Sequence, residues 1–210
     1  MIALLLAAAV PSTAVNAERA FARDAQALGQ WTAFAKWADR DAVMFTPQAV
    51  WARDFLKGRK NPPQSVRWWP ERAISSCDGH TTVTAGPWRI PSSNATGGFT
   101  TVWQLDKQNW RWVYDAGDQS YKSGKPPARI RSERASCRGK APGAPVPPPP
   151  ALTAKQANST PADYGRGNSA DKTLGWDWKV KPDGTRLFRT YLWNGTRYRL
   201  VLNQTVAPQK

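Results

Sequence analysis

The sequence predicts an α+β protein in which helices lie on one face of an antiparallel sheet, followed by a C-terminal three-stranded antiparallel meander. Three observations support this class. Apolar residues recur at helical spacing over residues 18–39 and then alternate in shorter runs up to residue 117. A proline-rich segment interrupts the chain at residues 139–151. Three more alternating runs, separated by tight-turn signals, follow between residues 173 and 203. Helices that precede a run of strands are typical of α+β domains.

Residues 1–17 have the features of a secretory signal peptide. The apolar run Ile2–Val10 is shorter than the roughly 20 residues that a membrane helix needs. Val15 and Ala17 suit the small-residue rule for a cleavage site. We therefore expect cleavage after Ala17 and an exported protein, periplasmic or secreted. The alternative is a buried N-terminal helix.

Residues 18–138 form the first predicted domain. Its helical stretch breaks at Gly29, and a short strand over residues 41–45 ends at Pro47. A short helix over residues 50–56 comes next, and strands are expected over 64–73 and 81–89. An antiparallel hairpin over residues 99–117 completes this domain.

The hairpin has an aromatic face. If Leu105 pairs with Trp110, strict alternation places one set of residues on a single face: Phe99, Thr101, Trp103, Leu105, Trp110, Trp112 and Tyr114. Asp115 is then expected on the opposite face, beside Arg111. The aromatic face must be covered, either by the helices or by the C-terminal meander.

The cysteines predict a disulfide bond. The chain contains only Cys77 and Cys137, too few for a metal site and not in a C-x-x-C pair. In an exported protein they would be oxidised. A bridge that closes about 60 residues stabilises by roughly 4 kcal/mol on the loop-entropy model.

Residues 139–172 are predicted to be a Pro-rich and polar linker, and residues 173–203 the meander. Pairing Val180 with Thr185 puts Trp176, Trp178 and Leu187 on one face, and Arg186 with Phe188 on the other. Some thirty residues cannot bury such a face alone. The meander is therefore expected either to dock on the first domain or to pair with a partner molecule, for instance in a homodimer through the sheet.

Residues 18–137 resemble the nuclear transport factor 2-like superfamily, and in particular its SnoaL-like exported bacterial domains of unknown function. The resemblance is carried by ERAFARDAQALGQWTAFAKWADRDAVMFTP at residues 18–47 and by TVWQLDKQNWRWVYDAG at residues 101–117. It implies a cone, that is, a curved antiparallel sheet wrapped on the N-terminal helices around a pocket. Because the superfamily includes isomerases, dehydratases, cyclases and non-catalytic binding modules, the fold alone assigns no chemistry.

The isomerase residues of that superfamily are missing here. Members that resemble ketosteroid isomerase carry an Asp base just before the proline that ends the first strand and a Tyr in the first helix. The matching positions hold Thr46 and Ala22. A threonine hydroxyl is too weak a base to take a carbon-bound proton near neutral pH. We therefore expect no catalysis by that mechanism.

Three other residues are weak catalytic candidates: Asp115, His80 and Asp41. A strand-end carboxylate paired with an arginine and a surface histidine are the alternatives for them. The chain has 12 tryptophans, most of which should be core. Six aromatic residues are expected to line a pocket for a small apolar ligand: Trp31, Phe34, Phe45, Trp69, Trp88 and Trp103. No cofactor and no metal are predicted.

A net charge of +15 and a pI near 10.3 favour anionic surfaces, such as those of the cell envelope. Basic residues that only keep the protein in solution are the alternative. Nucleic acid is not expected, because the predicted meander separates its aromatic residues from most of its basic ones. Two functions remain open: a non-catalytic exported binding or interaction protein, and a lyase- or isomerase-like enzyme.

Overall fold

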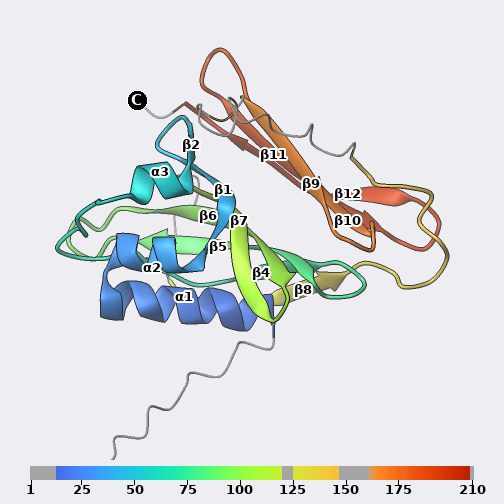
Figure 1. Ribbon diagram of the computed structural model, residues 1–210, viewed down its shortest axis with the longest axis horizontal. Helices are drawn as coiled ribbons and strands as arrows, with labels where there is room; N and C mark the ends of the chain where they lie inside the picture. The colour runs from blue at the N-terminus through green and yellow to red at the C-terminus, as the bar shows by residue number, and fades with distance from the viewer. Residues whose placement is uncertain (1–12, 120–124, 147–160, 162, 209–210) are drawn as a thin grey trace, which may run out of the picture.

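Figure 1 shows the computed structural model of the chain, which describes residues 13–119, 125–146, 161 and 163–208. A helical layer, a large mixed sheet and a smaller second sheet are stacked in that order (Figure 1). The helices are α1 (Ala14–Leu28), α2 (Gln30–Trp37) and α3 (Ala52–Leu56). The strands of the large sheet are β1 (Ala38–Phe45), β2 (Ala49–Trp51), β3 (Arg67–Trp68), β4 (Arg72–Ser75), β5 (Thr81–Arg89), β6 (Thr96–Asp106), β7 (Asn109–Asp118) and β8 (Arg131–Arg134). Those of the second sheet are β9 (Tyr164–Asn168), β10 (Leu174–Val180), β11 (Arg186–Trp193) and β12 (Tyr198–Val206). The predicted α+β class is confirmed.

Within the predicted signal peptide, residues 14–17 belong to α1 and Thr13 is its N-cap, whereas residues 1–12 lie outside the described residues. The Thr13 Oγ1 accepts a hydrogen bond from the Asn16 amide at 3.2 Å and so caps the helix. Ala14 and Ala17 are 2% and 0% exposed. Cleavage after Ala17 stays a prediction, and it would remove the cap and two buried alanines.

The break between α1 and α2 lies at Gly29, as expected. Gly29 has φ 94°, in a region where residues with a Cβ are strained. The Asn61 Oδ1 accepts hydrogen bonds from the amides of Trp31 (2.7 Å) and Thr32 (3.2 Å), which satisfies the first turn of α2. The two helices can therefore follow one another at an angle, and each packs its own buried residues on the sheet.

The large sheet has the strand order β2-β1-β7-β6-β5-β4-β8, with β3 paired to β5. Its pairs are antiparallel except β1–β7 and β4–β8, which are parallel. The strand predicted over residues 64–73 is in fact β3 and β4, separated at Pro70, which has no N–H for a ladder. The helix predicted over 50–56 is shorter, because its first residues pair with β1 as β2.

The hairpin's tryptophan face looks inward to the helices. Trp103, Trp110 and Trp112 are buried with Phe21 and Trp37 of the helical layer. The ring of Phe21 lies 4.8 Å from that of Trp68 and 6.0 Å from that of Trp103, in edge contacts. The helices therefore cover this face of the sheet.

The second sheet has the order β12-β11-β10-β9, one strand more than the predicted meander. The extra strand β9 lies in the segment assigned to the linker. Its sequence YGRGN has low strand propensity. The glycines are needed by packing: a Cβ on Gly165 would overlap the indole of Trp178, and one on Gly167 that of Trp176.

The register between β10 and β11 differs by one residue from the expected one. Val180 pairs with Arg186 rather than Thr185, because the turn includes Lys181 to Thr185 and the Lys181 amide donates to the Thr185 carbonyl at 2.8 Å. A shift of one residue exchanges the faces of a strand. Phe188 therefore shares the buried face with the tryptophans of β10, and so does Arg186.

The second sheet packs on the face of the large sheet that points away from the helices. The Phe188 ring lies 4.7 Å from Tyr114, and the Trp178 ring 5.1 Å from Phe45. The Arg72 Nη2 donates to the Val201 carbonyl at 2.7 Å and joins the two sheets. The second sheet therefore has its apolar cover within the same chain.

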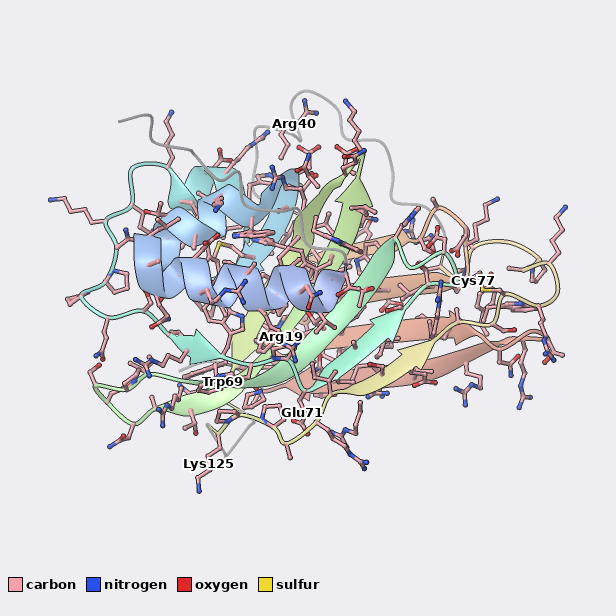
Figure 2. All side chains as sticks on the ribbon, turned by 90° about the horizontal axis from the view of Figure 1, so that it is seen from below. Arg19, Arg40, Trp69, Glu71, Cys77 and Lys125 are labelled. Atoms are coloured by element: carbon pink, nitrogen blue, oxygen red, sulfur yellow. A yellow bond between two sulfur atoms is a disulfide. The ribbon has the colours of Figure 1, made fainter. Side chains whose placement is uncertain are left out.

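The predicted disulfide between Cys77 and Cys137 is present, with its Cα atoms 5.2 Å apart. It joins the turn between β4 and β5 to the segment after β8; Cys77 is labelled in Figure 2. Ser136, which precedes Cys137, donates a hydrogen bond from its amide to the Trp193 carbonyl at 2.8 Å. The bridge therefore fixes the chain where it passes from the large sheet to the second one.

Part of the proline-rich segment is described. Val146 is buried, and the Asn168 Nδ2 donates to its carbonyl at 2.9 Å, so this part packs on the second sheet. The rest of the predicted linker up to residue 160 lies outside the described residues.

Candidate functional site

A β-bulge in β7 decides which side chains face the helices. Val102 pairs with Tyr114 but Trp103 pairs with Trp112, so Val113 is an extra residue with no partner on β6. After the bulge the alternation is reversed. Tyr114 faces the second sheet, and Asp115 turns to the helix side; both placements are opposite to those expected from strict alternation.

Asp115 therefore sits on the helix-facing side of the large sheet, directly opposite Thr101 of β6. The Thr101 Oγ1 donates a hydrogen bond to Asp115 Oδ2 at 2.8 Å. The alternative, a carboxylate paired with an arginine, is not formed by Asp115 among the described residues; the neighbouring Arg111 places its Nη1 3.5 Å from the Trp110 carbonyl. Asp115 keeps some accessible surface because it lines a cavity.

The cavity has a volume of about 280 Å³ and lies between α2, β1 and the inner face of the sheet. Its lining is mostly aromatic and aliphatic: Trp31, Phe34, Met44, Phe45, Val66, Trp68, Trp88, Ile90 and Phe99, with Gly117. The polar side chains of its lining are Gln30, Thr46 and Asp115. Asp115 is the one titratable group among the described residues that line it.

Burial raises the pKa of Asp115 to about 7. The hydrogen bond from Thr101 opposes this shift, the charge of Glu18 adds to it, and the charge of Arg186 opposes it. Near neutral pH this carboxyl is therefore divided between a neutral form that donates a hydrogen bond and an ionised form that accepts one.

Glu18 is a second buried acid, which sequence reasoning treated as an ordinary helix residue. It is 0% exposed, and its Oε1 accepts a hydrogen bond from Trp68 Nε1 at 2.7 Å. Its Oε2 accepts from Thr84 Oγ1 at 2.6 Å and from Trp103 Nε1 at 2.7 Å. Burial raises the pKa of Glu18, and these hydrogen bonds oppose the shift.

A series of polar side chains links the two acids along the helix-facing side of the sheet. Thr84 donates to Glu18 and lies opposite Thr101 in the β5–β6 ladder, and Thr101 donates to Asp115. Glu18 lies outside the cavity and Asp115 inside it. The deep acid thus influences the cavity acid by its charge and through one pair of facing threonines.

The predicted pocket residues separate into three groups. Four of them line this cavity: Trp31, Phe34, Phe45 and Trp88. Trp69 lines a different hollow on the outside of α1. Trp103 is fully buried and serves as a hydrogen-bond donor to Glu18.

Asp41 and His80 lie away from the cavity. Asp41 is near two arginines, Arg40 at 3.6 Å and Arg53 at 3.8 Å, in a half-exposed ion-pair group. The side chain of His80 is 60% exposed, and its Nδ1 lies 3.8 Å from Asp78 Oδ2. Neither residue shares a site with Asp115.

The two positions that carry the isomerase residues in similar proteins also separate. Thr46 lines the cavity, whereas Ala22 lines the hollow on the outside of α1. Among the described residues, no group of three or more His, Cys, Asp or Glu side chains could hold a metal ion. No helix in the described ranges is both long and apolar enough to cross a membrane.

Comparison with known proteins gives likenesses in solved structures alone. No family model matches the chain, and no curated protein matches it. It is similar to an NTF-2-like protein of unknown function from Shewanella oneidensis MR-1, at 14% identity and a TM-score of 0.40 over 47% of this chain and 91% of that one. It is also similar to a putative ketosteroid isomerase from Parabacteroides distasonis, at 14% identity and a TM-score of 0.42 over 55% and 95%.

A putative ketosteroid isomerase from Kribbella flavida gives 17% identity and a TM-score of 0.34 over 57% of this chain and 88% of that one. Likenesses of this size concern the fold and carry no argument about chemistry. The chain is thus similar to solved structures of NTF2-like proteins and of putative ketosteroid isomerases.

Proposed function

We propose that the cone cavity binds a small, mostly apolar molecule that carries one hydrogen-bonding group, and that Asp115 contacts this group. The observation that carries the proposal is the bulge at Val113, which turns a carboxyl into a cavity otherwise lined mainly by aromatic and aliphatic side chains. Few polar groups in an apolar pocket are typical of small-molecule sites.

The size of the cavity limits the ligand. Its volume of about 280 Å³ is near the lower end of the range for small-molecule pockets, roughly 300–1,000 Å³. A molecule of about two fused rings suits it. With a pKa near 7, Asp115 can donate to a carbonyl or accept from a hydroxyl at the same pH.

Calorimetric titration with 2-naphthol and with naphthalene tests this proposal. We expect naphthol to bind about tenfold more tightly, because a buried hydrogen bond to a carboxyl contributes on the order of 1.5 kcal/mol. The preference should disappear in Asp115→Leu and persist in Asp41→Leu, a carboxylate outside the cavity. Equal binding of the two probes by the unaltered protein, or loss of the preference in both variants, contradicts the proposal.

A proton-transfer enzyme of the lyase or isomerase kind is the second candidate. It is favoured by the pKa of Asp115, since a general acid–base group works best near the operating pH. It ranks second because the cavity lining holds no other titratable side chain among the described residues that could serve as a second acid–base group. The ketosteroid isomerase mechanism is not proposed.

Exchange of a carbon-bound proton into D₂O separates the two candidates. A β,γ-unsaturated ketone that fits the cavity should take up deuterium no faster than in buffer if the protein only binds it. Catalysed exchange that is lost in Asp115→Asn and kept in Asp41→Asn would favour the enzyme.

We also propose that the protein is exported. The disulfide supports this, because such bonds persist in oxidising compartments. Expression of the full chain in a bacterium, followed by fractionation and N-terminal sequencing, tests it. A periplasmic product that starts at Glu18 is the expected result, and a cytoplasmic product with residues 1–17 attached would contradict it.

A further inference from the structure

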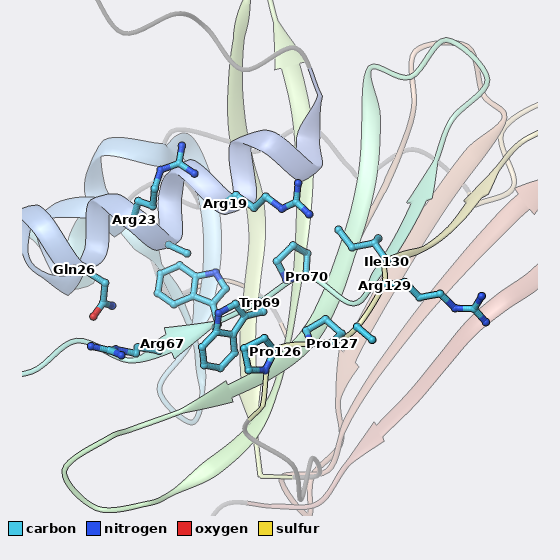
Figure 3. A pocket seen from close by; sticks show the side chains of 13 residues that line it. Arg19, Arg23, Gln26, Arg67, Trp69, Pro70, Pro126, Pro127, Arg129 and Ile130 are labelled. Atoms are coloured by element: carbon cyan, nitrogen blue, oxygen red, sulfur yellow. The ribbon is translucent and has the colours of Figure 1, made fainter.

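A second hollow, outside the cone, carries a concentration of positive charge. It has a volume of about 470 Å³ and lies between α1, the β3–β4 connection and residues 126–130 (Figure 3). Its described lining includes four arginines and no acidic side chain: Arg19, Arg23, Arg67 and Arg129. We refer to it as the arginine groove.

One face of α1 forms a wall of this groove. Arg19, Ala22, Arg23 and Gln26 follow the i, i+3, i+4, i+7 spacing that places residues on one side of a helix. The two arginines are one turn apart, about 6 Å along the axis. The small side chain of Ala22 leaves room between them and the floor.

The floor is aromatic and proline-rich. Trp69 lies at the centre, with Pro70, Pro126 and Pro127 around it (Figure 3). Figure 2 shows Arg19 and Trp69 from below, on the same side of the molecule. Trp68 is 6% exposed, so Trp69 supplies the main open aromatic surface.

These arginines lack the partners that nearby ones have. In the described part of the chain, Arg19, Arg23 and Arg67 form no ion pair. By contrast, Arg131 pairs with Glu71 at 2.9 Å. Arg67 also lies directly opposite Arg89 in the β3–β5 ladder, and like charges in facing positions repel. A bound anion would relieve this repulsion.

The guanidinium groups are arranged around the groove and do not meet at one point. Arg19 and Arg23 project from α1, Arg67 extends along the opposite side of Trp69, and Arg129 points away from it (Figure 3). A single phosphate would contact few of them. A chain with negative groups at intervals could contact three.

We propose that the arginine groove binds an anionic polysaccharide, with its carboxylates on Arg19, Arg23 and Arg67 and one sugar ring on Trp69. Arginine holds carboxylates through paired hydrogen bonds. The C–H face of a sugar ring packs on an indole. Single-stranded nucleic acid would need aromatic residues in series for successive bases, and this groove offers one. A flat lipid surface fits a concave groove poorly.

Binding of a galacturonate oligomer, compared with the same oligomer after methyl esterification, tests the proposal. We expect the charged oligomer to bind and the ester to bind at least about tenfold more weakly. The triple variant Arg19→Gln/Arg23→Gln/Arg67→Gln should weaken binding by about tenfold or more. It should also reduce the slope of log Kd against the logarithm of the salt concentration by about two to three, roughly one for each arginine removed.

A matched control removes three positive charges that do not line the groove: Lys57→Gln/Lys179→Gln/Arg197→Gln. It should keep the affinity within about twofold. Equal losses in the two triple variants would mean that net charge alone attracts the ligand. Tighter binding of oligothymidylate or of anionic vesicles than of the oligomer would assign the groove to another ligand. Either result overturns the proposal.

Trp69→Leu separates stacking from charge, and unchanged affinity in that variant would contradict the placement of the sugar ring.

Discussion

The two faces of the large sheet are packed in different ways. The face toward the second sheet is closed: Phe188, Trp178 and Tyr114 fill it, and Arg186, which is buried as well, donates to the Gly117 carbonyl at 2.8 Å. The face toward the helices contains two buried acids and a cavity. The second sheet packs on the large sheet from behind, and the cavity and the two acids lie on the helix side.

Among the changes that test this difference between the two faces, Phe188→Ala should cause the largest loss of unfolding free energy. Phe188 is almost fully buried and stacks on Tyr114 at 4.7 Å, directly behind the bulge. Truncation of a buried Phe costs about 3–5 kcal/mol. Chemical denaturation should show this loss of unfolding free energy, whereas Leu200→Ala, at an exposed position of β12, should change it by less than about 0.5 kcal/mol. Similar losses in both variants would mean that the second sheet does not support the large one.

Removal of the disulfide should come next. The bridge between Cys77 and Cys137 closes a loop with a sequence separation of 60. The loop-entropy model gives about 4 kcal/mol for it, and measured values are typically about 2–4. Cys77→Ala/Cys137→Ala should lower the unfolding free energy by that amount. Two thiols that react with an alkylating reagent in the unreduced, unfolded protein would contradict the bridge.

Glu18→Gln tests the polar contacts on the helix-facing side of the large sheet. The carboxylate accepts from two indoles and one hydroxyl, and a glutamine has one acceptor oxygen in place of two. We expect a loss of about 1–3 kcal/mol from the donor left without a partner. The pKa of Asp115 should also fall, because the charge of Glu18 raises it. An unchanged pKa of Asp115 in Glu18→Gln would contradict the coupling.

The pH dependence of stability tests the ionisation of Asp115 itself. The folded pKa of Asp115, about 7, lies above its unfolded value of about 3.9. The native state therefore keeps a proton that the unfolded chain loses, and stability falls as pH rises from about 4 to about 7. The slope from this one group is at most about 1.4 kcal/mol per pH unit. Asp115→Asn should flatten the curve in that range, and an unchanged curve would contradict the buried, protonated carboxyl.

The sequence predicted the parts of the fold that follow regular periods. Helical spacing located the break at Gly29, and alternation located β5 and the Leu105–Trp110 pair of the hairpin. It failed where a single residue disturbs the period. Val113 is an ordinary strand residue in the sequence, yet as a bulge it turns Asp115 to the other face.

The remaining differences have the same kind of cause. The turn before β11 is one residue longer than predicted, which buries Arg186. Strand β9 resembles a loop in the sequence because it contains Gly165 and Gly167. Only glycine fits at these positions, since a Cβ would overlap the indole that packs against each of them. Glu18 lies on a helix near charged residues, and nothing local shows that two tryptophans from distant strands donate to it. Such contacts depend on tertiary packing.

The central claim is that Asp115 presents a carboxyl to the cone cavity that is protonated up to neutral pH. A ¹³C NMR titration of the Asp115 side-chain carboxyl tests it most directly, with assignment by Asp115→Asn. The structure predicts a midpoint near pH 7. A midpoint for Asp115 below about pH 5, in the usual range of aspartate, would contradict the account.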